Sequence, residues 1–130
     1  MIRAFELGDH LDTKVSELST GLRKRAGIVS GLLLNPSLLM LDEPTNAIHP
    51  LSRNLFIDLI KQLRAGGRTI LSITHDLDYC WNTADRAIIL DHQHIVADRA
   101  IADFPEYEDF TQWTTLGRQQ AAVDFGIRSR

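Results

Sequence analysis

The sequence predicts an α/β fold in which helices flank a mainly parallel sheet. Residues 38–41 are four consecutive apolar residues, Leu-Leu-Met-Leu, which is typical of a short strand buried on both faces. Residues 69–74 form a second apolar, β-rich run, and the stretch between the two runs has the pattern of an amphipathic helix. Because a strand–helix–strand unit crosses over in a right-handed sense, the two strands are expected to lie parallel in one sheet.

Cap and breaker residues define the expected helices. One helix has Ser19 as its N-cap and ends before Pro36, because proline prevents its continuation. Another begins at Pro50, carries a leucine at every fourth position, and ends at two glycines. Two later β-rich runs, residues 86–91 and 94–98, are expected to be short strands.

The composition limits the class of protein. A chain of 130 residues with 44% hydrophobic and 24% charged residues fits one globular domain. The formal net charge of −3 gives no basic field, so no nucleic-acid partner is expected. The single cysteine, Cys80, cannot form an internal disulfide and favours the reducing cytoplasm. There is no signal-peptide pattern and no apolar run long enough to span a bilayer, so any membrane association is expected to go through a partner.

Three titratable residues, Asp42, Glu43 and His75, directly follow the two predicted parallel strands. Ligands of open α/β sheets bind beyond the carboxyl ends of the strands, so the three are expected at one edge. There an aspartate can hold Mg²⁺, directly or through its waters, and a glutamate can orient or deprotonate a water. A histidine can hydrogen-bond a terminal phosphate. The pattern indicates metal-assisted phosphoryl transfer.

Each of these residues also has a plainer interpretation. A carboxylate pair after a strand is often a solvated turn, and a single histidine often caps a helix or packs against a neighbour. Their order on adjacent strand ends favours the catalytic interpretation over the plainer one.

Three ordered segments, LSTGLRKR, LLMLDEPTNAIHP and ILSITHD, resemble the second half of the nucleotide-binding domain of ABC transporter ATPases. In that family they are the signature motif, the Walker B strand with its catalytic glutamate and D-loop, and the switch histidine. The resemblance covers about residues 14–98. It implies a P-loop NTPase-like fold and an ATP-hydrolysing subunit that powers solute transport.

The resemblance assigns roles residue by residue. It implies Asp42 as the magnesium residue, acting through water, Glu43 as the general base and His75 as the γ-phosphate sensor. Ser19 and Gly21 correspond to signature residues that reach the ATP of a partner chain. The implied cofactors are therefore ATP and Mg²⁺. The implied partners are a membrane subunit and a second nucleotide-binding chain or second copy, with a cytoplasmic location peripheral to the membrane.

The sequence departs from the family pattern at three motif positions. Thr20 replaces the first signature glycine and adds a side chain where backbone should approach phosphate closely. Leu22 replaces the usual glutamine and cannot hydrogen-bond nucleotide. His49 stands where the D-loop aspartate is expected, which puts the cross-dimer role of that loop in doubt.

The family's phosphate-binding loop, Walker A, is absent from this sequence, because no segment matches G-x-x-x-x-G-K-[ST]. The Q-loop is absent with it. The chain thus resembles a C-terminal half, with a missing N-terminal half as a further partner. The expected domains are a half domain over residues 1–98, made of a signature-helix part (1–35) and a core (36–98), and a helical tail over 99–130.

The missing strand has a structural consequence. In this fold the Walker A strand lies between the strands expected at residues 69–74 and 86–91. Without it, each would carry unpaired backbone groups at a cost of about 1 to 3 kcal/mol apiece. We therefore expect that the chain closes its sheet differently, borrows a strand from another chain, or is a fragment of a longer product.

Aromatic residues recur at every third position of the tail, at Phe104, Tyr107, Phe110 and Trp113. Such a stripe is either a docking face for a partner or a helix packed on its own domain. The second interpretation is favoured.

Two functions remain open. The first is the catalytic half of an ABC transporter ATPase, inactive alone because Walker A normally cradles the phosphates. The alternative is a truncated, nucleotide-incompetent module that binds, regulates or oligomerises without catalysis, or an inactive remnant.

Overall fold

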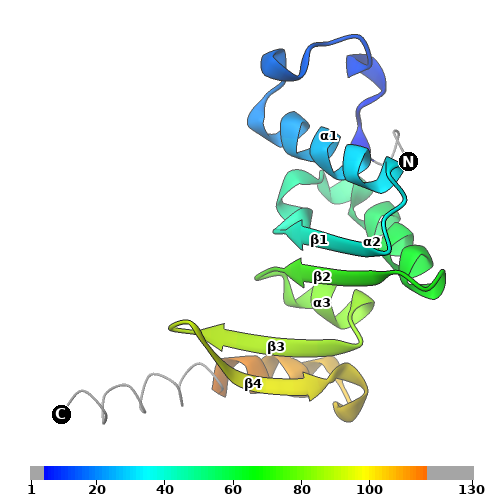
Figure 1. The fold of residues 1–130 in the computed structure, drawn as a ribbon. Coiled ribbons are helices and arrows are strands. Elements are labelled where there is room, and N and C mark those ends of the chain that lie inside the picture. The colour runs from blue at the N-terminus through cyan, green and yellow to red at the C-terminus, as the bar shows by residue number, and fades with distance from the viewer. Residues whose placement is uncertain (1–4, 117–130) are drawn as a thin grey trace. The chain divides into compact units, whose positions relative to one another are not determined.

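The computed structural model describes residues 5–116 (Figure 1). The chain divides into two compact units, Met1–Asp76 and Leu77–Arg130. Within the described residues no helix combines the length and the hydropathy that a membrane crossing requires.

Within residues 5–76, the described part of the first unit, two α-helices and two parallel strands are connected through short 3₁₀ turns (Figure 1). In chain order its elements are η2 (Gly8–His10), η3 (Val15–Glu17), α1 (Thr20–Leu33), β1 (Leu38–Asp42), η4 (Pro44–Ala47), α2 (Pro50–Ala65) and β2 (Thr69–Ile73).

Both predicted helices of the first unit are confirmed, with their caps. The Oγ of Ser19 accepts the backbone N–H of Leu22 at 3.2 Å, which satisfies one of the free donors at the start of α1. Pro50 is the first residue of α2, where its fixed φ suits the helix and its missing N–H costs nothing. After α2, Gly67 adopts a φ of 86°, a conformation that glycine reaches without steric cost.

Strands β1 and β2 pair in parallel, as predicted. The register runs from Leu38 opposite Thr69 to Asp42 opposite Ile73. The pairing extends one residue further, because the N–H of Glu43 donates to the carbonyl of Ile73 at 2.8 Å.

The prediction that residues 38–41 are buried on both faces is wrong. Leu39 and Leu41 are buried, but Leu38 and Met40 are 52% and 67% exposed. The pleat sends alternate side chains to opposite faces, and in the described residues only one of those faces is covered. The core of this unit contains Phe5 and Phe56, whose rings meet edge to face with centroids 5.6 Å apart, and the apolar residues Leu39, Leu41, Ile57 and Ile60.

The second unit contains α3 (Leu77–Thr83), β3 (Arg86–Asp91), β4 (His94–Ala100), η5 (Ile101–Asp103) and a helical stretch at residues 107–116. Strands β3 and β4 form an antiparallel hairpin with an irregularity between Ile89 and Leu90. Its turn places His92 and Gln93 at positive φ. In the described part of the chain, backbone pairing therefore joins β1 to β2 and β3 to β4, in two separate two-stranded sheets. Among residues 5–116 no strand pairs with the second edge of β2 or of β3.

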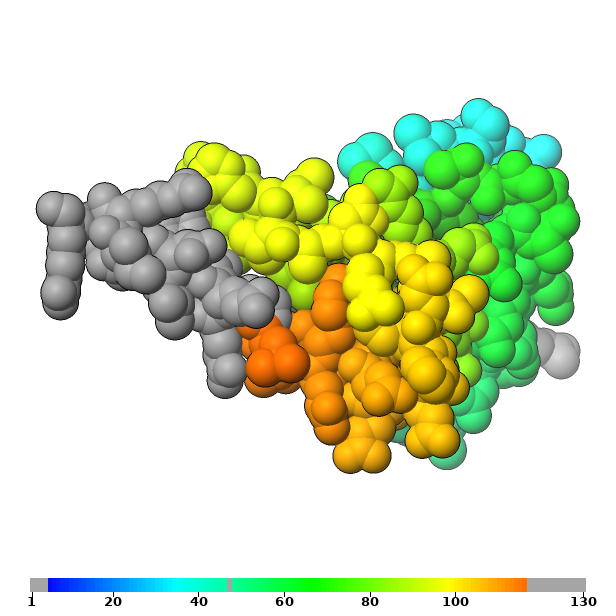
Figure 2. Space-filling view, turned by 90° about the horizontal axis from the view of Figure 1, so that it is seen from below, coloured from blue at the N-terminus to red at the C-terminus, as the bar shows by residue number. Residues whose placement is uncertain are grey.

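The aromatic stripe packs on its own unit, as favoured above. Phe104 and Phe110 are buried with Ala87, and Trp81 and Trp113 pack against them. The rings of Trp81 and Phe110 lie 5.7 Å apart between centroids, and those of Phe104 and Trp113 lie 5.2 Å apart. Figure 2 shows the orange residues of this helix beside the yellow and gold residues that follow β3.

The N-cap of α2 yields a prediction. The Nδ1 of His49 accepts the N–H of Leu51 at 3.3 Å, so His49 fills the capping position. Aspartate is a stronger N-cap and its charge favours a helix N-terminus. His49→Asp is therefore expected to raise the free energy of unfolding by about 0.5 to 1 kcal/mol, measured by urea denaturation.

His49→Ala is the matched variant, and it is expected to lower stability by about 0.5 to 2 kcal/mol because no side chain then accepts the Leu51 N–H. Equal stability of the Asp and Ala variants would show that His49 does not act as the cap.

Candidate functional site

Glu43 follows β1 in a conformation that only a few residue types adopt readily. Its φ and ψ are 45° and 55°, in the left-handed region, and Pro44 then opens the 3₁₀ turn η4. For a residue with a Cβ this conformation costs roughly 1 to 2 kcal/mol. The turn redirects the chain away from the strand at Glu43.

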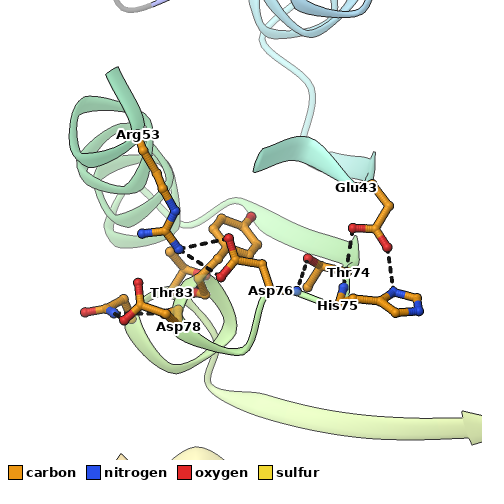
Figure 3. A network of polar contacts seen from close by, with 9 residues as sticks. Glu43, Arg53, Thr74, His75, Asp76, Asp78 and Thr83 are labelled. Carbon is orange, nitrogen blue, oxygen red and sulfur yellow. Dashed lines mark hydrogen bonds and ion pairs between the residues drawn. The ribbon is translucent and has the colours of Figure 1, made fainter. Parts of the chain in front are cut away.

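His75 and Glu43 are in direct contact, as Figure 3 shows. The Nδ1 of His75 lies 2.7 Å from Oε1 of Glu43, and the backbone N–H of His75 donates to Oε2 at 3.3 Å. An ionised carboxylate only accepts, so with ionised Glu43 the Nδ1 of His75 carries the proton. The His75 side chain is 81% exposed and that of Glu43 is 22% exposed. The Nε2 side of the ring is therefore open to a ligand.

Asp42 is the last residue of β1 and is exposed. It lies on the same face of the strand as Met40 and borders a cavity of about 340 Å³ lined also by Lys24, Ile28 and Pro44. Among residues 5–116 no three His, Cys, Asp or Glu side chains gather as metal ligands. A single carboxylate still fits Mg²⁺, because Mg²⁺ keeps several waters and takes its other ligands from substrate phosphates.

Ser19 and Gly21, the signature positions, lie at the start of α1 and are exposed. The Ser19 hydroxyl is engaged as the helix cap. A Cβ built on Gly21 would meet no atom within 4 Å, so the backbone there is open on its outer side. These two residues are not part of the Glu43–His75 contact.

Sequence reasoning missed an ion pair beside this contact. The Nη2 of Arg53, in the first half of α2, donates to Oδ1 and Oδ2 of Asp76 at 2.8 and 2.9 Å (Figure 3). Asp76 also donates its backbone N–H to Oγ1 of Thr74 at 3.0 Å. Opposite charges at these two positions are visible in the sequence, but pairing across 23 residues depends on the strand register.

The chain is similar to known proteins both in sequence and in fold. Residues 2–79 match the family model described as "AAA domain, putative AbiEii toxin, Type IV TA system". The daunorubicin/doxorubicin resistance ATP-binding protein DrrA of Streptomyces peucetius is 38% identical over 98 residues, which are 75% of this chain and 30% of DrrA. A solved ATP-binding subunit of an ABC transporter superposes with a TM-score of 0.70 at 28% identity, over 78% of this chain and 42% of that one. The chain belongs to the ABC ATPases.

The match to ABC ATPases also extends into the C-terminal part of the chain. A probable amino-acid ABC transporter ATP-binding protein of Haemophilus influenzae is 30% identical over 124 residues, which are 93% of this chain and 48% of that protein. The chain thus spans less than half the length of these ABC relatives. The predicted family and the α/β P-loop NTPase-like fold class are confirmed, whereas the roles of Asp42, Glu43, His75, Ser19 and Gly21 stay predictions.

The backbone strain at Glu43 is testable with two variants that both remove the carboxylate. Glu43→Gly relieves the left-handed conformation, whereas Glu43→Ala keeps it. Glu43→Gly is expected to be the more stable by about 1 kcal/mol in urea denaturation, after allowing for the entropy of glycine in the unfolded chain. Stability of the alanine variant equal to or above that of the glycine variant would contradict a strained site.

Proposed function

We propose that this chain is the catalytic-base half of an ABC ATPase domain that hydrolyses ATP to drive solute transport through a separate membrane subunit. The observation that carries the proposal is the contact between Nδ1 of His75 and Oε1 of Glu43, at 2.7 Å, beyond the carboxyl ends of two parallel strands. A carboxylate held by an imidazole at this edge is suited to act on a water that attacks a phosphate.

In the proposed reaction a water oxygen bonds to the γ-phosphorus, the bond from that phosphorus to the β–γ bridging oxygen breaks, and ADP and phosphate leave. Glu43 takes the water proton at a carboxylate oxygen. As an imidazolium, with both ring nitrogens protonated, His75 holds that carboxylate through Nδ1–H and donates from Nε2–H to a γ-phosphate oxygen. Asp42 would hold Mg²⁺ through water. The metal supplies charge that offsets the phosphate oxygens in the transition state.

A separate half is part of this proposal. Residues that cradle phosphate through G-x-x-x-x-G-K-[ST] are not in this sequence, and the chain spans less than half of its relatives. The parallel pair also has an apolar face made of Leu38, Met40, Leu71 and Ile73, all 48% or more exposed. Parallel sheets are normally covered on both faces. The proposed cover is the N-terminal half that carries the phosphate loop, supplied by an upstream segment or by another chain.

The remaining partners follow from the same family. Ser19 and Gly21 would contact the ATP bound by a second nucleotide-binding chain or a second copy of this chain. The exposed backbone at Gly21 suits that approach. The membrane subunit would place the chain at the cytoplasmic surface. In this proposal residues 1–98 form the half domain and residues 99–130 its tail.

One set of observations favours the alternative, a module that binds or regulates without catalysis. Thr20 and Leu22 replace residues that approach nucleotide in the family pattern, and the phosphate loop is not in this sequence. The same ATPase experiment separates the two functions.

ATP binding and turnover with Mg²⁺ are measured for the chain alone and for the chain mixed with a polypeptide that carries the phosphate loop. The chain alone is expected to be inactive and the mixture active. Glu43→Gln is expected to lower kcat of the mixture by about 10² to 10⁴-fold, because glutamine cannot accept the water proton.

Glu17→Gln is the matched control, since Glu17 is an exposed carboxylate in η3, and its turnover is expected to equal that of the parent. Turnover that survives Glu43→Gln would remove Glu43 as the base. A mixture that neither binds nor hydrolyses ATP would favour the non-catalytic alternative.

A further inference from the structure

Two side chains from the part of the chain after β1 contact two adjacent residues that follow β2. Glu43, at the end of β1, contacts both the ring and the backbone N–H of His75. Arg53, ten residues further along, contacts the carboxylate of Asp76. In Figure 3 the Arg53 guanidinium and the Glu43 carboxylate approach residues 74–76 from opposite sides.

The two contacts differ in how far solvent weakens them. Arg53 and Asp76 are each 24% exposed, so their charges are partly shielded from water. The ring of His75 is 81% exposed and has little packing of its own to fix its orientation. The Arg53–Asp76 pair is therefore the better placed of the two to fix the backbone from which His75 projects.

The backbone of this segment also lacks the freedom to absorb a shift. The N–H of Asp76 is bound to Oγ1 of Thr74, which closes a tight turn around His75. Arg53 lies on α2, whose start is fixed by Pro50 and the His49 cap. A rigid helix thus anchors the turn, and the turn presents His75 to Glu43.

We propose that Arg53 and Asp76 are positioning residues, whose ion pair holds the His75 imidazole in the orientation in which Nδ1 donates to Glu43. Neither residue touches the reacting atoms in this account. The orientation itself is independent of ATP turnover, and its use in catalysis rests on the function proposed above.

The test is the tautomer of His75, read by long-range ¹H–¹⁵N correlation from the carbon-bound ring protons of the full chain at a mildly alkaline pH. Free neutral histidine prefers the proton on Nε2, whereas donation to Glu43 requires it on Nδ1. In the parent chain the Nδ1–H form is expected to predominate. Arg53→Gln and Asp76→Asn are each expected to lower the ratio of Nδ1–H to Nε2–H about fivefold, the factor that a contact of this strength contributes.

The reversed pair, Arg53→Glu with Asp76→Arg, restores opposite charges and is expected to return the ratio to within about twofold of the parent. Arg86→Gln is the matched control, because it removes a guanidinium from the Arg86–Asp98 pair of the β3–β4 hairpin. It should leave the ratio unchanged. Glu43→Ala is the positive control for loss of the acceptor, because it removes both carboxylate oxygens.

An unchanged ratio in both Arg53→Gln and Asp76→Asn, with Glu43→Ala lowering it, would overturn the positioning role while leaving the Glu43–His75 contact intact. Circular dichroism identifies any variant that fails to fold. In that case the near-isosteric Asp76→Asn and the reversed pair decide. If Asp76→Asn folds and keeps the parental ratio, the proposal is overturned. If Asp76→Asn lowers the ratio and the reversed pair restores it, the proposal is supported. Failure of the ATPase proposal would appear separately, as absent turnover in the mixture with the phosphate-loop polypeptide while the chain keeps the parental ratio.

Discussion

The parallel pairing of β1 with β2 is the constraint on which the site depends. The register sets Asp42 opposite Ile73, and the bond from the Glu43 N–H to the Ile73 carbonyl carries the pairing one step beyond the strand. Because side chains alternate along a strand, a slip by one residue would turn every side chain to the other face. It would also move His75 away from Glu43. The site is thus determined by a pairing of ten residues, five from each strand.

The same pairing leaves one face and one edge of the sheet in the first unit uncovered by the described residues. Two parallel strands bury alternate residues on one face and leave Leu38, Met40, Leu71 and Ile73 on the other. In the described residues β2 has a backbone partner on one edge only. Both features are costly for a free-standing unit, because an exposed apolar face and a sheet edge without a neighbouring strand favour association with another segment. They support the proposal that a second half completes the sheet.

Several parts of the fold could be predicted from the sequence because they depend on local chemistry. Ser19, Pro50 and the glycines after α2 act within one or two helical turns of their own positions, and the structure confirms both helices. The two strands were also predictable, since short apolar runs bounded by polar turns are typical of strands. The meeting of Glu43 and His75 followed from the general rule about strand ends.

Other parts could not be read from the sequence. The exposed face of Leu38 and Met40 was missed because an apolar run indicates burial without showing what covers each face, and the described residues cover only one face. The Arg53–Asp76 pair was missed because its geometry depends on where α2 sits over the turn at residues 74–76. The capping role of His49 was missed because the family pattern drew attention to the aspartate it replaces, rather than to the free N–H groups beside it.

We propose that the β1–β2 pair is preformed and that a second half, which supplies the phosphate loop, pairs with its open edge. Hydrogen exchange of the β2 peptide, Thr69–Ile73, measured with and without a polypeptide that carries this loop, tests it most directly. The account predicts that exchange in this peptide slows about tenfold or more in the mixture, because a new strand would bond the edge of β2 that faces away from β1. Exchange rates that stay the same, in a mixture shown to form a complex, would contradict it.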